Sequence, residues 1–207
     1  MVTVLGMARR SFDDRALTSS PDMRRLPTRL DGLVLLEPAV HGDERGFFME
    51  TWREDAWTEH GVPSAFVQDN HSRSRQGTVR GIHFQTHPGQ GKLVRCARGA
   101  VLDVVVDLRR GSPSFGEWEG FELDDVHGRQ LWIPIGFGHG FCVLSETADF
   151  VYKCTNYYDP ATESGFRFND PDVGIEWPDV ELLYSERDRL APTLAQVADE
   201  LPFRYAE

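Results

Sequence analysis

The feature that most constrains the fold is a series of short apolar runs that recur along the chain from Gly32 onward. About ten runs are separated by glycine, proline, aspartate or asparagine, at intervals of roughly 8 to 12 residues. Short strands with regular turn signals are typical of a β-sandwich, jelly roll or barrel, so we expect a mostly β fold of one of these types with a few short helices. The runs are 33–36, 46–51, 65–68, 78–84, 92–97, 101–108, 118–123, 130–134, 140–144 and 150–155.

The rest of the chain indicates one domain with an extension. Residues 1–29 are polar and arginine-rich without sustained periodicity, so we expect them to be disordered or loosely attached. Residues 30–207 are expected to form the single domain, with helical signal limited to 53–60 and 185–200. The run 101–107 alternates only in part, which predicts a strand that is buried on both faces in its middle.

Composition and charge exclude several classes of protein. Hydrophobic residues make up 40% of the 207, which allows a sizeable core. The net charge of −11 argues against nucleic-acid polymers and anionic membranes as main partners. No run approaches the ~20 apolar residues of a membrane-spanning helix. Three irregularly spaced cysteines (Cys96, Cys142 and Cys154) fit reduced core thiols, and we expect a cytoplasmic protein.

His83 is the first candidate for a catalytic or binding residue. On a strand, Arg80, Ile82 and Phe84 would share one face and His83 would lie on the other. If that face lines a cavity, the imidazole points into it. By itself, a histidine on such a strand is more often a satisfied core residue, so this position alone proves nothing.

The segment 133–140 has the proline, glycine and histidine spacing of the later half of a cupin metal motif. Such a site also needs two histidines one residue apart and a glutamate a few residues on. Near His83 the sequence offers only His87, with no glutamate after it. We therefore expect no metal, and stoichiometric iron, zinc or manganese in the purified protein would support the alternative of a cupin metalloenzyme.

A tyrosine-rich strand is the third candidate. Tyr152, Cys154 and Asn156 would share one of its faces. Tyrosines at this density usually pack in a core or at its rim, but a phenol across a cavity from a histidine is a ready proton donor.

Taken together, these segments resemble one known family, the dTDP-4-dehydrorhamnose 3,5-epimerases. The resemblance runs from about Leu33 to Leu194, with the blocks in the same order. A match of this length is specific, although any single block would not be. The blocks are Asp43 to Glu50, Phe66 to Ser72, Val79 to Gln85, Gly91 to Cys96, Ile133 to Phe141 and Tyr152 to Tyr158.

The resemblance implies a mostly β, cupin-like jelly-roll barrel or sandwich that is homodimeric, holds no metal or cofactor, and acts on a dTDP-4-keto-6-deoxy sugar. It identifies His83 as the catalytic base, Tyr152 as the acid and Asp188 as the carboxylate that orients the histidine. Lys92 would stabilise the charge that develops on the ketone oxygen. From the residues alone, Asp188 is equally well explained as a helix-start partner of Ser185, and Lys92 as a surface lysine.

The resemblance also implies a set of substrate contacts. Arginines would pair with the diphosphate, because the planar guanidinium matches phosphate oxygens. Arg187 stands where a lysine is more usual in the family, which keeps the charge and changes the geometry. The implied diphosphate ligands are Arg45, Arg80 and Arg187; those for the thymine are Phe48, Glu50 and Glu163; and further substrate contacts are Gln68, Asn70, His139 and Tyr158.

The expected reaction inverts C3 and C5 of the keto sugar through an enolate, converting dTDP-4-dehydro-6-deoxyglucose into dTDP-4-dehydrorhamnose. An alternative is a mono-epimerase of an antibiotic-sugar pathway that inverts only one centre, since both reactions need the same residue types. A second alternative is a sugar-nucleotide binding barrel without activity.

Overall fold

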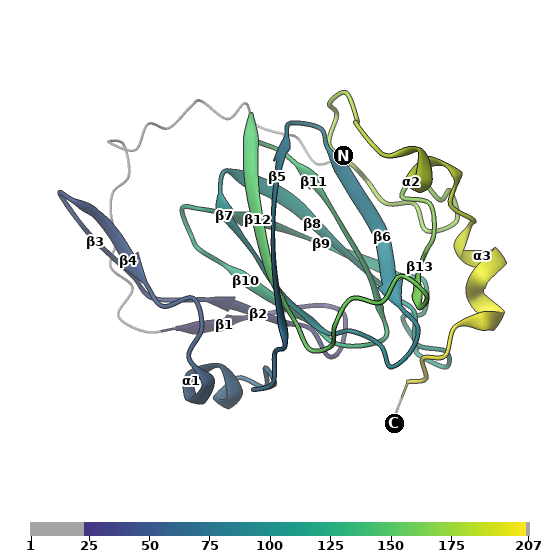
Figure 1. Cartoon of the computed structure of the whole chain (residues 1–207), viewed down its shortest axis with the longest axis horizontal. Helices are drawn as coiled ribbons and strands as arrows, with labels where there is room; N and C mark the ends of the chain where they lie inside the picture. The colour runs from purple at the N-terminus through teal and green to yellow at the C-terminus, as the bar shows by residue number, and fades with distance from the viewer. Residues whose placement is uncertain (1–22, 206–207) are drawn as a thin grey trace.

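The computed structural model describes residues 23–205, which form two facing antiparallel sheets with short helices at their margins (Figure 1). The first sheet has the spatial order β1 (Arg24–Leu26), β2 (Val34–Glu37), β10 (Gln130–Ile133), β7 (Lys92–Arg98), β12 (Thr147–Cys154) and β5 (Gln68–Arg75). The second has the order β13 (Glu163–Gly165), β6 (Val79–Gln85), β11 (Phe137–Val143), β8 (Ala100–Asp107) and β9 (Trp118–Asp124). The prediction of a mostly β jelly-roll sandwich is confirmed.

Outside the two sheets lie a hairpin and the helices. The hairpin joins β3 (Val40–Asp43) to β4 (Gly46–Met49) and projects away from both sheets (Figure 1). Helix α1 (Glu54–Glu59) falls in the first predicted helical region. The second region is broken into α2 (Glu186–Leu190), α3 (Leu194–Val197) and the 3₁₀ turn η2 (Ala198–Glu200). The break contains Pro192, and Thr193 starts α3 with a capping box to Gln196.

The core accounts for the burial of β8. One apolar cluster fills the space between the sheets and includes Val105 and Phe150. Another covers the opposite face of the second sheet and includes Val106 and Phe203. Strand β8 is therefore buried on both faces, as predicted for the middle of the run 101–107.

The structure departs from the strand predictions most clearly at β5. Residues 65–67 of the predicted run 65–68 are not in a strand, and β5 begins at Gln68 and continues through polar residues to Arg75. Alternate residues of β5 are exposed, while the others face the interior between the sheets. A strand with polar side chains on both faces carries no hydrophobic period, so the pattern could not reveal it.

Most of the predicted extension lies outside the described residues. Of its remainder, Arg24–Leu26 forms β1, and the Arg29 backbone N–H donates to the Glu119 carboxylate at 2.9 Å. None of the helices in the described part of the chain is long and apolar enough to span a membrane. All three cysteines are free and buried, as predicted.

Candidate active site

A polar cavity of about 210 Å³ opens at one end of the space between the sheets. Because β7 and β12 are antiparallel, the start of β7 meets the end of β12, which brings Lys92 opposite Cys154 and places Tyr152 further in. Most of the residues that line the cavity are predicted site residues: Gln68, Asn70, His83, Lys92, Tyr152, Tyr158 and Glu163. The rest of the lining consists of Phe84, Gln85 and Gln90.

His83 and Asp188 form a hydrogen-bonded pair at the cavity. His83 Nε2 lies 2.7 Å from Asp188 Oδ1, which leaves Nδ1 as the ring nitrogen available to a ligand. Asp188 is buried on α2, and its backbone N–H donates to Ser185 Oγ at 3.0 Å. The two interpretations of Asp188, as helix-start partner of Ser185 and as partner of the histidine, are therefore both realised. Burial alone would raise the pKa of Asp188, but the bond with His83 holds it below its usual value.

Arg80 does not line the cavity, but it lies on the same side of β6 as His83, which the simple alternation did not predict. The Arg80 guanidinium donates to Ser74 Oγ at 3.2 Å and interacts electrostatically with Tyr152. The alternation breaks at Gly81, whose φ is +137° and where an added Cβ would lie 2.6 Å from Gly140 Cα. Only glycine allows β6 and β11 to approach so closely, so this residue sets where the histidine points.

Tyr152 enters the cavity from the sheet that faces His83. Burial raises the pKa of its phenol, and the nearby Cys154 and Glu163 act in the same direction. The side chain therefore remains a protonated phenol across the neutral pH range. An imidazole on one sheet and a phenol on the other can act on opposite faces of a bound ring.

Lys92 reaches the cavity from β7. Burial lowers the pKa of its ammonium group, while Cys154, Glu163 and Asp103 favour the charged form. A desolvated cation of this kind interacts more strongly with a developing negative charge than a solvated one does. This cavity placement differs from that of a typical surface lysine.

The nucleotide-binding candidates on the later part of the chain lie at the rim. The Tyr158 hydroxyl donates to Glu163 Oε2 at 2.8 Å, and Arg187 Nη1 donates to the same oxygen at 2.7 Å. Gln68 Oε1 accepts from the Tyr158 backbone N–H at 2.9 Å, and Gln68 Nε2 donates to Asn70 Oδ1 at 3.1 Å. These contacts link β5, β13 and α2 around one opening.

Three predicted contacts, Arg45, Phe48 and Glu50, lie away from this cavity. Arg45 and Phe48 are on the β3–β4 hairpin, where Arg45 pairs with Asp43 and Phe48 is 69% exposed. Glu50 follows the hairpin and accepts from Arg53 at 3.0 Å. The hairpin lies on the opposite side of the sheets from β6 and β13 (Figure 1).

His139 does not line the cavity but lies beside it. Its Cα pairs with that of His83, and its Nε2 is 2.8 Å from Asp103 Oδ2. Both members of this second pair are buried. The sequence reasoning missed Asp103, as well as the lining residues Gln85 and Gln90; a carboxylate inside the apolar run 101–108 was the available signal.

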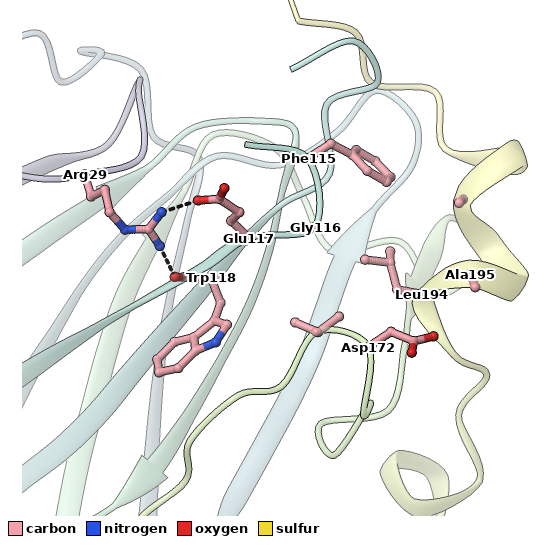
Figure 2. Close-up of a pocket in the computed structure, with 10 residues that line it drawn as sticks. Arg29, Phe115, Gly116, Glu117, Trp118, Asp172, Leu194 and Ala195 are labelled. Atoms are coloured by element: carbon pink, nitrogen blue, oxygen red, sulfur yellow. Dashed lines mark hydrogen bonds and ion pairs between the residues drawn. The ribbon is translucent and has the colours of Figure 1, made fainter. Parts of the chain in front are cut away.

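A larger hollow of about 560 Å³ lies between β9 and α3 (Figure 2). Arg29 bridges one wall through Glu117 and the Trp118 carbonyl, and the remainder of the lining is mainly apolar. Its lining contains no histidine, lysine, cysteine or tyrosine. The groups suited to proton transfer are in the smaller cavity, which is therefore the candidate active site. Residues 23–205 contain no cluster of three or more potential metal ligands.

The sequence is similar to that of one family of known enzymes. The profile described as dTDP-4-dehydrorhamnose 3,5-epimerase covers residues 27–196. The dTDP-4-dehydrorhamnose 3,5-epimerase of Salmonella typhimurium is 51% identical over 174 residues, 83% of this chain and 95% of that protein. The dTDP-4-dehydrorhamnose 3-epimerase of Streptomyces niveus is 46% identical over 179 residues, 86% of each chain.

The fold is also similar to that of a solved epimerase structure. The dTDP-6-deoxy-D-glucose-3,5-epimerase of Legionella pneumophila, crystallised with dTDP-4-keto-L-rhamnose, has a TM-score of 0.86 and 46% identity. The alignment covers 89% of this chain and all of that one. With its profile match, its sequence relatives and its fold in agreement, this chain belongs to the dTDP-4-dehydrorhamnose 3,5-epimerase family.

Proposed function

We propose that this protein inverts C3 and C5 of dTDP-4-dehydro-6-deoxyglucose to give dTDP-4-dehydrorhamnose. The observation that carries the proposal is the placement of His83, paired with Asp188, and Tyr152 on facing sheets of one cavity. Both carbons flank the ketone, which acidifies their C–H bonds. Removal of a proton gives an enolate, and return of a proton to the other face inverts the centre without a redox cofactor.

His83 is the base in this mechanism. Its Nε2–H donates to Asp188, which fixes the tautomer and leaves the Nδ1 lone pair to accept the carbon-bound proton. The Asp188 carboxylate then stabilises the imidazolium. Tyr152 delivers a proton to the opposite face, and its raised pKa keeps that proton on the phenol until the enolate forms.

General acid–base catalysis of this kind contributes ~10²- to 10⁴-fold, which does not by itself overcome the barrier to forming a sugar enolate. Lys92 supplies the further stabilisation, because its ammonium group meets the negative charge that develops on the ketone oxygen. A preorganised donor at such a position contributes roughly 3 to 4 kcal/mol. The buried setting of Lys92 supports this role.

The nucleotide extends from the cavity across the rim. In this proposal Arg80 and Arg187 pair with the diphosphate, and Tyr158 stacks on the thymine. Glu163 accepts from both Tyr158 and Arg187, so it holds these two groups relative to each other. Gln68, Asn70 and His139 complete the polar surroundings of the sugar.

We further propose that the protein acts as a homodimer in the cytoplasm. The β3–β4 hairpin carries an exposed aromatic residue and a guanidinium away from its own cavity. A second copy would bring Arg45, Phe48 and Glu50 over the cavity and complete the nucleotide site. Three free thiols fit a reducing compartment.

Mixing two inactive variants tests the exchanged hairpin. In a heterodimer of Arg45→Ala and His83→Ala subunits, one site has an intact histidine and an intact hairpin from the other subunit. Refolding the two together should recover on the order of a quarter of wild-type activity, since half of the dimers are mixed and half of their sites are intact. No recovery would show that the hairpin serves the cavity of its own chain.

Deuterium exchange tests the reaction itself. The protein is incubated with dTDP-4-dehydro-6-deoxyglucose in heavy water, and deuterium at C3 and C5 is counted by NMR. Double epimerisation labels and inverts both carbons. Inversion of one carbon alone would support the mono-epimerase alternative. The similarity to the Streptomyces niveus 3-epimerase is the observation that favours this alternative. Absence of label at both carbons would overturn the proposal.

A further inference from the structure

A second histidine–aspartate pair lies directly beside the first. His139 on β11 pairs across the sheet with His83, and its Nε2 is 2.8 Å from Asp103 Oδ2. Asp103 is fully buried, and its other oxygen, Oδ1, has no hydrogen-bond partner within the described chain. Buried carboxylate oxygens are rarely left unsatisfied, so this one calls for an explanation from its surroundings.

Those surroundings contain one lysine. Burial raises the pKa of Asp103, whereas His139 and Lys92 act to lower it, and Asp103 in turn favours the charged form of Lys92. The two side chains enter the same interior from opposite sheets, Lys92 from β7 and Asp103 from β8. The two groups therefore act on each other across this interior, with Asp103 fully buried and Lys92 at the wall of the cavity.

The other groups that face Lys92 are less able to balance its charge. Glu163 on β13 already binds Arg187, and the thiol of Cys154 on β12 is neutral because burial raises its pKa. Tyr152 on β12 is a protonated phenol, His83 on β6 is paired with Asp188, and His139 on β11 is paired with Asp103 itself. Asp103 is thus the carboxylate whose free oxygen remains available to the ammonium group.

We propose that Asp103 is a positioning residue that holds Lys92 as an ammonium group directed at the ketone oxygen, while His139 fixes the carboxylate through its other oxygen. This inference rests on the role proposed above for Lys92. It accounts for a carboxylate at position 103, which lies on the interior face of β8 between Val101 and Val105. It also assigns the second pair a function distinct from that of His83 and Asp188: the second pair maintains a cation and exchanges no proton with the sugar.

The sequence makes this proposal directly measurable, because Lys92 and Lys153 are the chain's two lysines. Protein carrying lysine labelled with ¹³C at Cε gives two signals, and Lys153→Arg assigns them. We expect Asp103→Asn to lower the pH at which the Lys92 signal titrates by about one unit or more, because a unit charge is removed from a water-poor site.

A matched variant controls for general effects of losing a carboxylate. Lys153 binds Asp69 at 3.0 Å on the exposed face of β12. Asp69→Asn should move the Lys153 signal and leave the Lys92 titration unchanged. If Asp103→Asn leaves the Lys92 titration at the wild-type pH, the proposal is overturned.

Kinetics give a second readout that a merely structural role would not produce. In Asp103→Asn the alkaline limb of the kcat profile should move to lower pH by the same amount as the NMR titration, with KM within about twofold of wild type. A uniform loss of kcat at every pH would contradict the inference. Wild-type exchange into C3 and C5 is measured in parallel, so failure of the proposed function is distinguished from failure of this inference.

If Asp103→Asn does not fold, Lys92→Met tests the same interaction, because it removes the ammonium group and keeps the carboxylate. Burial already raises the pKa of Asp103, and Lys92 counteracts that effect. A group with a raised folded-state pKa loses its stabilising contribution as pH rises through that value. Removing Lys92 should therefore make the urea midpoint fall further than in wild type as pH rises above the unfolded pKa of an aspartate, about 3.9. An unchanged slope would refute the coupling.

Discussion

Replacement of Asp188 by asparagine separates the chemistry of the His83–Asp188 pair from its packing. The carboxylate is buried and lies 2.7 Å from His83 Nε2, so the bond is short and shielded from water. A hydrogen bond to a charged group contributes about 1.5 to 3 kcal/mol, and each 1.4 kcal/mol is a factor of ten in rate. Loss of imidazolium stabilisation alone therefore lowers kcat by roughly 10- to 150-fold.

The substitution also removes the group that selects the tautomer. If the amide N–H faces Nε2, the ring proton moves to Nδ1, and the atom that should accept the sugar proton no longer can. In the serine-protease triad the corresponding change lowers kcat by about 10⁴-fold. We therefore expect Asp188→Asn to lower kcat by ~10²- to 10⁴-fold with little change in KM, since the carboxylate contacts the histidine and not the nucleotide.

The assay is the rate of deuterium incorporation at C3 and C5, with binding of dTDP measured separately by calorimetry. Asp179→Asn is the matched control, because Asp179 is an exposed aspartate outside the cavity. It should retain wild-type kcat. A kcat for Asp188→Asn within about threefold of wild type, in a folded protein, would refute the reasoning that Asp188 acts through His83.

Three further predictions concern other parts of the molecule. Tyr152→Phe should lower the rate of inversion by ~10²- to 10⁴-fold, yet still give deuterated substrate of unchanged configuration by NMR, because His83 can return a solvent-derived proton to the original face. Gly81→Ala should lower the free energy of unfolding in urea by roughly 1 to 3 kcal/mol through strain, and by more than Gly61→Ala, whose added methyl would meet nothing within 4 Å. Arg73 lowers the pKa of Asp149 to about 2, so Asp149 stabilises the fold above its unfolded pKa and loses that contribution as pH falls toward 2. Arg73→Gln should therefore be less stable than wild type at neutral pH in thermal unfolding, and the two curves should converge in acid.

The sequence predicted the sandwich because its apolar strands bury residues on the interior face. Val94, Val105 and Phe150 all belong to runs whose turn signals were visible. It did not predict β5, because polar side chains occupy both faces of that strand. Residues that line a cavity cannot follow the pattern of residues that fill a core.

The catalytic candidates were found through the resemblance more than through periodicity. Alternation placed His83 on the correct side of β6 but placed Arg80 on the wrong one, because it could not anticipate the irregularity at Gly81. Asp188 comes from a helix 105 positions away from the histidine that it contacts. No local pattern joins these two residues, and their pairing depends on how the C-terminal segment packs.

That packing has a practical consequence for handling the enzyme. On the face of β6 opposite His83, Ile82 and Phe84 pack in one apolar cluster. The same cluster contains Phe166, Leu201 and Phe203. The last two of these side chains lie within seven residues of the carboxyl end. A chain shortened to end before Leu201 would lose both of these side chains and with them the apolar support for the strand that carries His83.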